Sequence, residues 1–253
     1  MNNIFIIAKN TFKETIRDKI LYAILAFAVL FLLSTVIFGS ISLGEDVKVI
    51  KDFGLAGIYI FSIIIAIFLG TSLIYKEIEK KTLYILLSKP VSSVQFIIGK
   101  YFGLFASVIL NVAIMSIIYL GIVAYKGGGF DYLSLWSILL LVFEMSIFIA
   151  LAILFSTITT PLAGMIYSVI VLYIGHSLSL LKEAAIQSSK FAQIMTNIVY
   201  YGFPNLEKFN IRNLVVYGTS VTTAQIVYPI FYSILFTTVL LWISGFALKK
   251  KDL

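Results

Sequence analysis

The sequence has no cysteine, one histidine and few charged residues, which make up 12% of its 253 residues. The lack of cysteine excludes disulfides and thiolate metal sites. A soluble domain usually has about a quarter of its residues charged and about half apolar. This chain is instead 60% hydrophobic, with a mean hydropathy of +1.04. The composition is therefore that of a membrane protein.

The hydrophobic residues are gathered into long runs. A helix of about 20 residues, rising 1.5 Å per residue, crosses a hydrocarbon core of about 30 Å. The runs are too long for the short alternating strands of a transmembrane β-barrel. We therefore predict an all-α integral membrane protein, a six-helix transmembrane bundle forming one domain over residues 1–253. The expected spans are residues 20–43, 53–75, 96–125, 132–158, 162–181 and 226–248.

Basic residues indicate the orientation of the chain, because cytoplasmic loops are enriched in Lys and Arg. Placing both termini in the cytoplasm puts most of the 19 lysines and arginines on that side. We therefore predict a multi-pass protein of the cytoplasmic (inner) membrane. The net charge of +7 then reflects topology, and nucleic acid is not an expected partner.

Three segments outside the spans have patterns of their own. Residues 1–19 have helical spacing and predict an interfacial helix, with a solvated basic leader as the alternative. Residues 76–95 predict a short cytoplasmic helix that docks on a partner, or else an extension of the second span. Residues 182–225 form a long outer loop, in which 191–203 are apolar and aromatic. Pro204 follows them, so we expect a hairpin there, re-entrant or lying on the surface.

Polar residues inside the spans are candidates for function. Glu144 is the only charged residue well inside a span, where a carboxylate costs about 2.5–3.5 kcal/mol. It predicts either a substrate, proton or ion site or a hydrogen-bonded packing residue. Asn111 lies at a similar depth, so we expect the two to face each other or to share a polar partner. The lone His176 favours a polar packing role over metal binding.

Small residues recur every four positions in the third span, at Gly99, Gly103 and Ser107. Such stripes let helices approach closely. We expect a helix–helix contact here, within the bundle or across a dimer.

Several motifs resemble the permease subunits of type-2 ABC exporters, which have six spans. Glu77-x-Glu79-x-x-Thr82, Leu86-Leu87-Ser88-x-Pro90 and Gly99-Lys100 are similar to the family's coupling helix between spans two and three. Residues 8–19 resemble its N-terminal connecting helix, and Leu154-Phe155-Ser156 the end of its fourth span. Residues 203–209 resemble the outer loop of the branch containing the permease of nitrous oxide reductase copper-site maturation.

The resemblance implies the transmembrane subunit of an ATP-driven exporter that works by alternating access. The chain has no G-x-x-x-x-G-K-[ST] phosphate loop. A separate ABC ATPase would therefore bind ATP and Mg²⁺, while this chain would be no enzyme and bind no cofactor. A second permease copy, giving a homodimer, and membrane lipid are the other expected partners. The resemblance assigns contact with the ATPase to Glu77, Glu79, Lys80, Lys81, Thr82, Leu86, Leu87 and Pro90.

Two other functions stay open. An intramembrane enzyme of the Ser–His protease type would pair His176 with a serine. A membrane assembly subunit would have no transport cycle. The small number of polar residues recognised in the spans favours a lipid-like or amphiphilic cargo.

Overall fold

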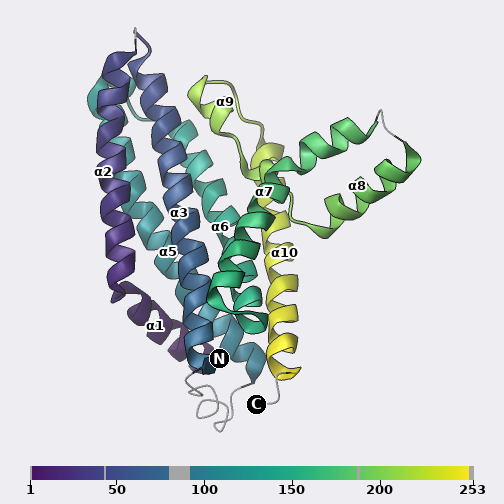
Figure 1. The fold of residues 1–253 in the computed structure, drawn as a ribbon. Coiled ribbons are helices and arrows are strands. Elements are labelled where there is room, and N and C mark those ends of the chain that lie inside the picture. The colour runs from purple at the N-terminus through teal and green to yellow at the C-terminus, as the bar shows by residue number, and fades with distance from the viewer. Residues whose placement is uncertain (1, 43, 80–91, 187–188, 251–253) are drawn as a thin grey trace.

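The computed structural model describes residues 2–42, 44–79, 92–186 and 189–250, most of which are helical. These ranges contain no strand, and six of their helices are long and apolar enough to cross a membrane. The predicted all-α membrane bundle is therefore confirmed. The six helices, drawn in Figure 1, are α2 (Lys19–Ile41), α3 (Asp46–Glu79), α5 (Ser93–Val123), α6 (Tyr132–Ile158), α7 (Pro161–Ile186) and α10 (Thr223–Lys250).

Local capping signals set where these helices begin. Asp18 caps α2 by accepting a hydrogen bond from the backbone nitrogen of Ile20 at 2.9 Å. Ser92 and Gln95 form a reciprocal capping box at the start of α5. Pro161 occupies the first position of α7, where a missing N–H costs nothing. Only Thr159 and Thr160 separate α6 from α7, so the turn between these helices is tight.

The second spanning helix, α3, is longer than its hydrophobic run. It begins at Asp46 rather than residue 53, because its basic residues find partners: Lys51 Nζ lies 2.7 Å from Asp131 Oδ2. It continues to Glu79, so Glu77 and Glu79 lie in the part of α3 beyond the spanning segment, Asp46–Leu73, rather than in a separate helix. The remaining predicted ATPase-contact residues lie outside the described residues: Lys80, Lys81, Thr82, Leu86, Leu87 and Pro90.

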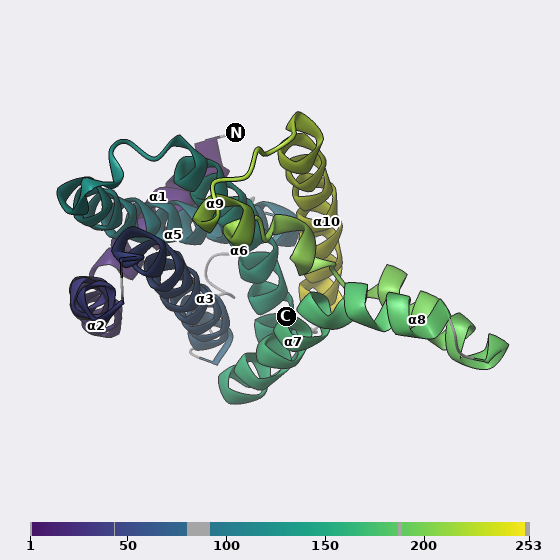
Figure 2. The same cartoon turned by 90° about the horizontal axis from the view of Figure 1, so that it is seen from above.

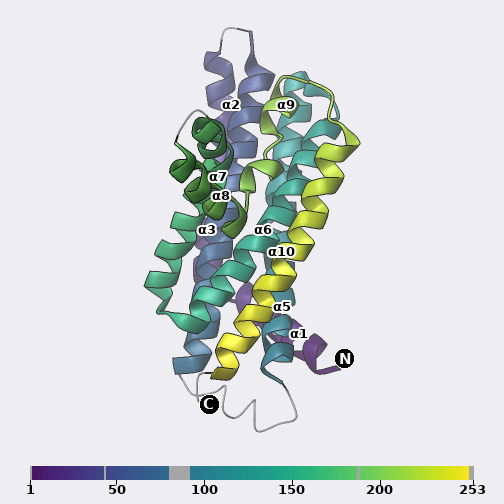
Figure 3. The same cartoon turned by 90° about the vertical axis from the view of Figure 1, so that its right-hand side faces the viewer.

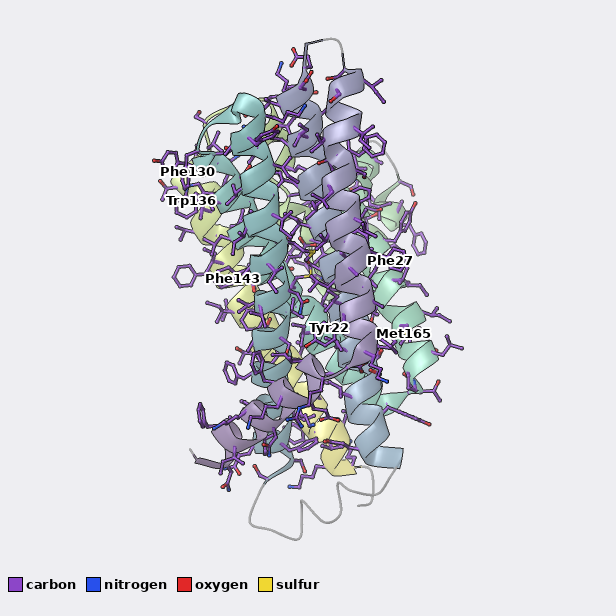
Figure 4. The ribbon with its side chains drawn as sticks, turned by 90° about the vertical axis from the view of Figure 1, so that its left-hand side faces the viewer. Tyr22, Phe27, Phe130, Trp136, Phe143 and Met165 are labelled. Carbon is purple, nitrogen blue, oxygen red and sulfur yellow. The ribbon has the colours of Figure 1, made fainter. Side chains whose placement is uncertain are left out.

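Helix α6 lies at the centre of the bundle and is the most buried of the six. It contacts α3, α5, α7 and α10, while α2 packs on the outer side of α3 (Figure 2). Outward-facing side chains such as Phe27 are apolar and exposed, as suits a surface in lipid (Figure 4). Both ends of the chain lie at the same end of the bundle, which we call the terminal end (Figures 1 and 3).

The small-residue stripe of α5 packs against α1 (Asn2–Ile16) within the same chain. A Cβ atom added at Gly99 would lie 2.8 Å from the Ile7 side chain, and one at Gly103 would lie 2.6 Å from Thr11. Ser107 continues the buried stripe and donates to the carbonyl of Gly103 at 3.0 Å. The predicted helix–helix contact is therefore between the N-terminal helix and the third span.

The segment after α7 has two parts. The end of α7 and α8 (Lys190–Gly202) form a helical hairpin that projects sideways from the bundle (Figures 1 and 2). No residue of α8 is buried, so of the aromatic segment 191–203 only Phe203, which follows α8, packs against the core. The chain enters just after it: residues 204–206 are buried, followed by the short helix η2 (Leu206–Phe209) and α9 (Arg212–Val216).

Candidate functional site

Glu144 lies half-way along α6, so an α-helical rise places it about 18 Å from the start of that helix at Tyr132. Only 2% of the residue is exposed. The hydroxyl of Tyr59 on α3 donates to its Oε1 at 2.9 Å, and His176 Nε2 on α7 lies 3.2 Å from the same oxygen. The other oxygen, Oε2, has no hydrogen bond to the described residues.

His176 lies between two carboxylates. Its Nδ1 is 3.0 Å from Oε2 of Glu207, on η2, while Nε2 faces Glu144 and also contacts the Tyr59 hydroxyl. For His176 to donate to both carboxylates, both ring nitrogens must carry protons, and the ring then offsets one negative charge. We call Tyr59, Glu144, His176 and Glu207 the Glu144 cluster.

Glu207 reaches membrane depth because the chain around it inserts between α6, α7 and α10. The close approach depends on Gly175: a Cβ atom there would lie 2.5 Å from Leu206 Cδ1 and 2.7 Å from the Pro204 carbonyl oxygen. Asn205 anchors the segment by donating its backbone N–H to the Tyr232 hydroxyl at 2.9 Å. Leu206 and Phe209 are both buried. Irregular backbone at this depth is tolerated because protein, not lipid, surrounds it.

A cavity of about 190 Å³ lies beside the Glu144 cluster. Glu144, Tyr59 and His176 line it, and Asn210 and Arg212 line the part nearest α9. Asn210 Nδ2 donates to Glu207 Oε1 at 3.0 Å. Arg212 Nε lies 3.1 Å from Asp52 Oδ1, an ion contact without hydrogen-bond alignment. Leu55 and Tyr59 lie in the first half of α3, and Ser137 and Ile138 lie near the start of α6. Both helices start at the end opposite the termini, so the cavity belongs to that half of the bundle (Figure 1).

The pairing expected between Glu144 and Asn111 is wrong. Asn111 Nδ2 donates to the Ser107 carbonyl of its own helix at 2.8 Å, and its buried Oδ1 has no partner among the described residues. Glu144 instead points toward α3 and α7. Equal depth in the membrane says nothing about the direction in which a side chain leaves its helix.

Sequence reasoning missed Tyr59 and Glu207. Tyr59 is one of 15 tyrosines, and no pattern distinguishes it. Glu207 belongs to a segment singled out by resemblance, but nothing in the local sequence shows that this segment enters the bundle. Within the described ranges, no three His, Asp or Glu side chains are placed to hold a metal ion together.

A second polar group lies at the terminal end, where α3 ends and α5 begins. Lys100 is only 4% exposed, and its Nζ lies 2.6 Å from Glu77 Oε1 and 3.6 Å from Glu14 Oε2. Burial raises the pKa of Glu77 above its usual range, and the ammonium of Lys100 offsets only part of this effect. This Lys100 junction (Glu14, Glu77 and Lys100) connects α1, α3 and α5.

Comparison with known proteins identifies the family. The family described as "ABC-2 family transporter protein" matches residues 5–253. No curated protein matches the chain. The branch suggested by residues 203–209 stays a prediction. A match over nearly the whole length, together with six spanning helices, fits a transporter membrane component that is not itself catalytic. The chain therefore belongs to the ABC-2 transporter family, as a multi-pass transmembrane subunit of an ABC transporter.

Proposed function

We propose that this chain is half of a dimeric exporter of the cytoplasmic membrane, driven by a separate ABC ATPase. Family membership implies such an ATPase partner. The terminal end would face the cytoplasm, because the positive-inside bias and the common position of both termini agree. The second permease would be another copy of this chain, and ATP and Mg²⁺ would bind the ATPase alone.

The observation that carries this proposal is the Lys100 junction. Residues 80–91 connect α3 to α5, and the junction joins the end of the first helix to the start of the second. A buried ion pair fixes the end of α3 to the start of α5, and the contact with Glu14 adds α1. A push by the ATPase on this connection would therefore move three helices together rather than bend one loop. Nucleotide binding would favour one bundle state through its different contacts there.

The protease alternative finds no support in the geometry. The partners of His176 among the described residues are Tyr59, Glu144 and Glu207, none of which is a serine. Both ring nitrogens face carboxylates, and the hydroxyl that Nε2 contacts among the described residues belongs to a tyrosine, so neither nitrogen is placed to activate a serine.

The test uses affinity-purified full-length chain with whatever ATPase co-purifies. We expect Glu77→Gln to leave the complex assembled but to change the ATP hydrolysis rate, because it weakens the junction. Glu45→Gln is the matched control: Glu45 pairs with Lys48 at the other end of α3, where its side chain is 57% exposed. Unchanged assembly and ATP hydrolysis in both variants would contradict coupling at this junction. Purification without any ATPase would contradict the function itself.

A further inference from the structure

The cavity beside the Glu144 cluster is large enough for more than ordered water. At about 190 Å³ it exceeds more than tenfold the ~10–15 Å³ that one water requires. It is smaller than the ~300–1,000 Å³ of pockets for drug-sized ligands. The space therefore suits a molecule of a few heavy atoms.

The charge around the cavity is negative. Two carboxylates, Glu144 and Glu207, face one imidazole, so a negative charge remains even when His176 is protonated. Arg212 also lines the cavity, but its ion contact with Asp52 means that this pair adds no net charge. An uncompensated carboxylate at this depth is costly, and a bound cation would remove that cost.

The acceptor for such a cation is already in place. Glu144 uses Oε1 for both of its hydrogen bonds, and its side chain is only 3% exposed, yet it lines the cavity. Ser137 lines the same cavity about two turns earlier on the same face of α6. Its hydroxyl makes no hydrogen bond to the described residues, so a second polar group is open to a ligand.

The rest of the lining favours an organic cation over a metal ion. Hard metal cations take about six oxygen ligands, and the described side chains offer no such group. Leu55, Ile138 and Leu141 supply apolar contacts, and Tyr59 and Phe209 add aromatic rings, a group to which ammonium ions are attracted. This combination suits a cationic head with a short carbon skeleton.

We propose that this cavity binds a small organic cation, an amine or quaternary ammonium compound, with Glu144 as its counter-ion. The proposal rests on the proposed transport function only in taking the ligand as cargo. It replaces the expectation of a lipid-like cargo, which followed from too few polar residues being recognised in the spans. The Glu144 cluster and Ser137 supply those residues.

The test measures binding by calorimetry to the purified full-length chain in lipid nanodiscs. The probes are choline, its uncharged isostere 3,3-dimethylbutan-1-ol, and propylammonium. We expect one of the two cations to bind and the neutral isostere to bind at least tenfold more weakly. Equal binding of choline and the isostere, or binding of neither cation, would overturn the proposal. The second result would mean that a proton neutralises the carboxylate instead.

Two variants locate the site. Glu144→Gln keeps the shape and removes the charge, so cation affinity should fall at least tenfold. Ser137→Phe fills the cavity without touching the cluster and should have the same effect. Glu183→Gln is the control, since Glu183 is an exposed residue outside the cavity; it should bind as the unmodified chain does. Cation binding that survives both cavity variants would place the site elsewhere.

This experiment requires no ATPase, so its outcome is separate from that of the proposed function. Cation binding without an associated ATPase would support the site and contradict the proposed ATP-driven export. An ATPase complex that binds no cation would support the proposed function and contradict the cation site.

Discussion

Replacing Lys100 by methionine removes the cation at the Lys100 junction and keeps the apolar length of the side chain. The Lys100 side chain is 5% exposed, and its ammonium lies 2.6 Å from Glu77, whose side chain is 19% exposed. Removing one partner of a buried pair costs about 3–5 kcal/mol, because the other charge stays buried. The second contact, with Glu14, adds little since Glu14 is 51% exposed.

Protonation of Glu77 limits this cost. Protonating a carboxyl of ordinary pKa, about 4.3, at pH 7 costs about 3.7 kcal/mol at 1.36 kcal/mol per pH unit. Burial already raises the pKa of Glu77, so its protonation costs less than this. We therefore expect Lys100→Met to lower the free energy of unfolding by about 2–3 kcal/mol at pH 7.

The assay is thermal and denaturant unfolding of the full chain in detergent. The double variant Lys100→Met/Glu77→Gln should recover most of the loss, giving a coupling energy of about 2 kcal/mol. Lys48→Met is the control, because the Lys48–Glu45 pair has a similar distance, 2.7 Å, but is largely exposed. Lys48→Met should lower the free energy of unfolding by less than about 1 kcal/mol. Equal losses from the two lysine substitutions would refute the reasoning.

The pH dependence provides an independent check. In Lys100→Met the pKa of Glu77 is higher in the folded than in the unfolded chain, because burial remains and the lowering effect of Lys100 is gone. The folded state then binds more protons, so the stability of the variant rises as pH falls toward the unfolded pKa. The difference in the free energy of unfolding between Lys100→Met and the unmodified chain should therefore become smaller as the pH is lowered from 8 to 5. If the difference in the free energy of unfolding becomes larger in acid, the expected uptake of a proton by Glu77 in the folded variant is wrong.

Two further predictions concern the end opposite the termini. Gly175→Val should lower stability by about 1–3 kcal/mol and expose residues 203–211 to added protease, because its side chain would overlap Leu206; unchanged proteolysis would contradict the packing. Asp131→Asn should cost about 1.5–3 kcal/mol in unfolding experiments at pH 7, since Asp131 is 7% exposed and paired with Lys51. Burial raises the pKa of Asp131, but the hydrogen bonds and charge of Lys51 and Ser134's hydrogen bonds hold it below its usual range. This stabilisation is therefore complete above about pH 4 and is lost as pH falls below that value, so the cost of Asp131→Asn should disappear in acid.

The spans were predictable because hydropathy reports the free energy of moving a helix into lipid, which depends on composition alone. All six expected spans correspond to helices, and 132–158 coincides with α6. The start of α3 was not predictable. Lys51 lies inside the helix because Asp131, from the loop before α6, neutralises it. Such compensation depends on tertiary structure and leaves no local signal.

The polar site was predictable only in part. A carboxylate inside a span marks Glu144 from the sequence alone, because its burial must be compensated. Its partners Tyr59 and His176 come from α3 and α7, and Glu207 of η2 joins the cluster through His176; these elements are far apart in the sequence. The insertion of η2 depends on the close approach at Gly175, which is one glycine among 16. The partner of the Gly99–Gly103 stripe was equally hidden, since a small-residue stripe does not identify the helix that packs on it.

The most direct test of alternating access uses the natural absence of cysteine. Ser137→Cys places one thiol in the cavity, and its rate of reaction with a water-soluble reagent can be measured in the complex with its ATPase. The account predicts that this rate changes several-fold between the nucleotide-free complex and one trapped with Mg-ATP and vanadate, while exposed Glu45→Cys reacts equally in both. Equal rates for Ser137→Cys in the two states would contradict a cavity whose access is switched by ATP.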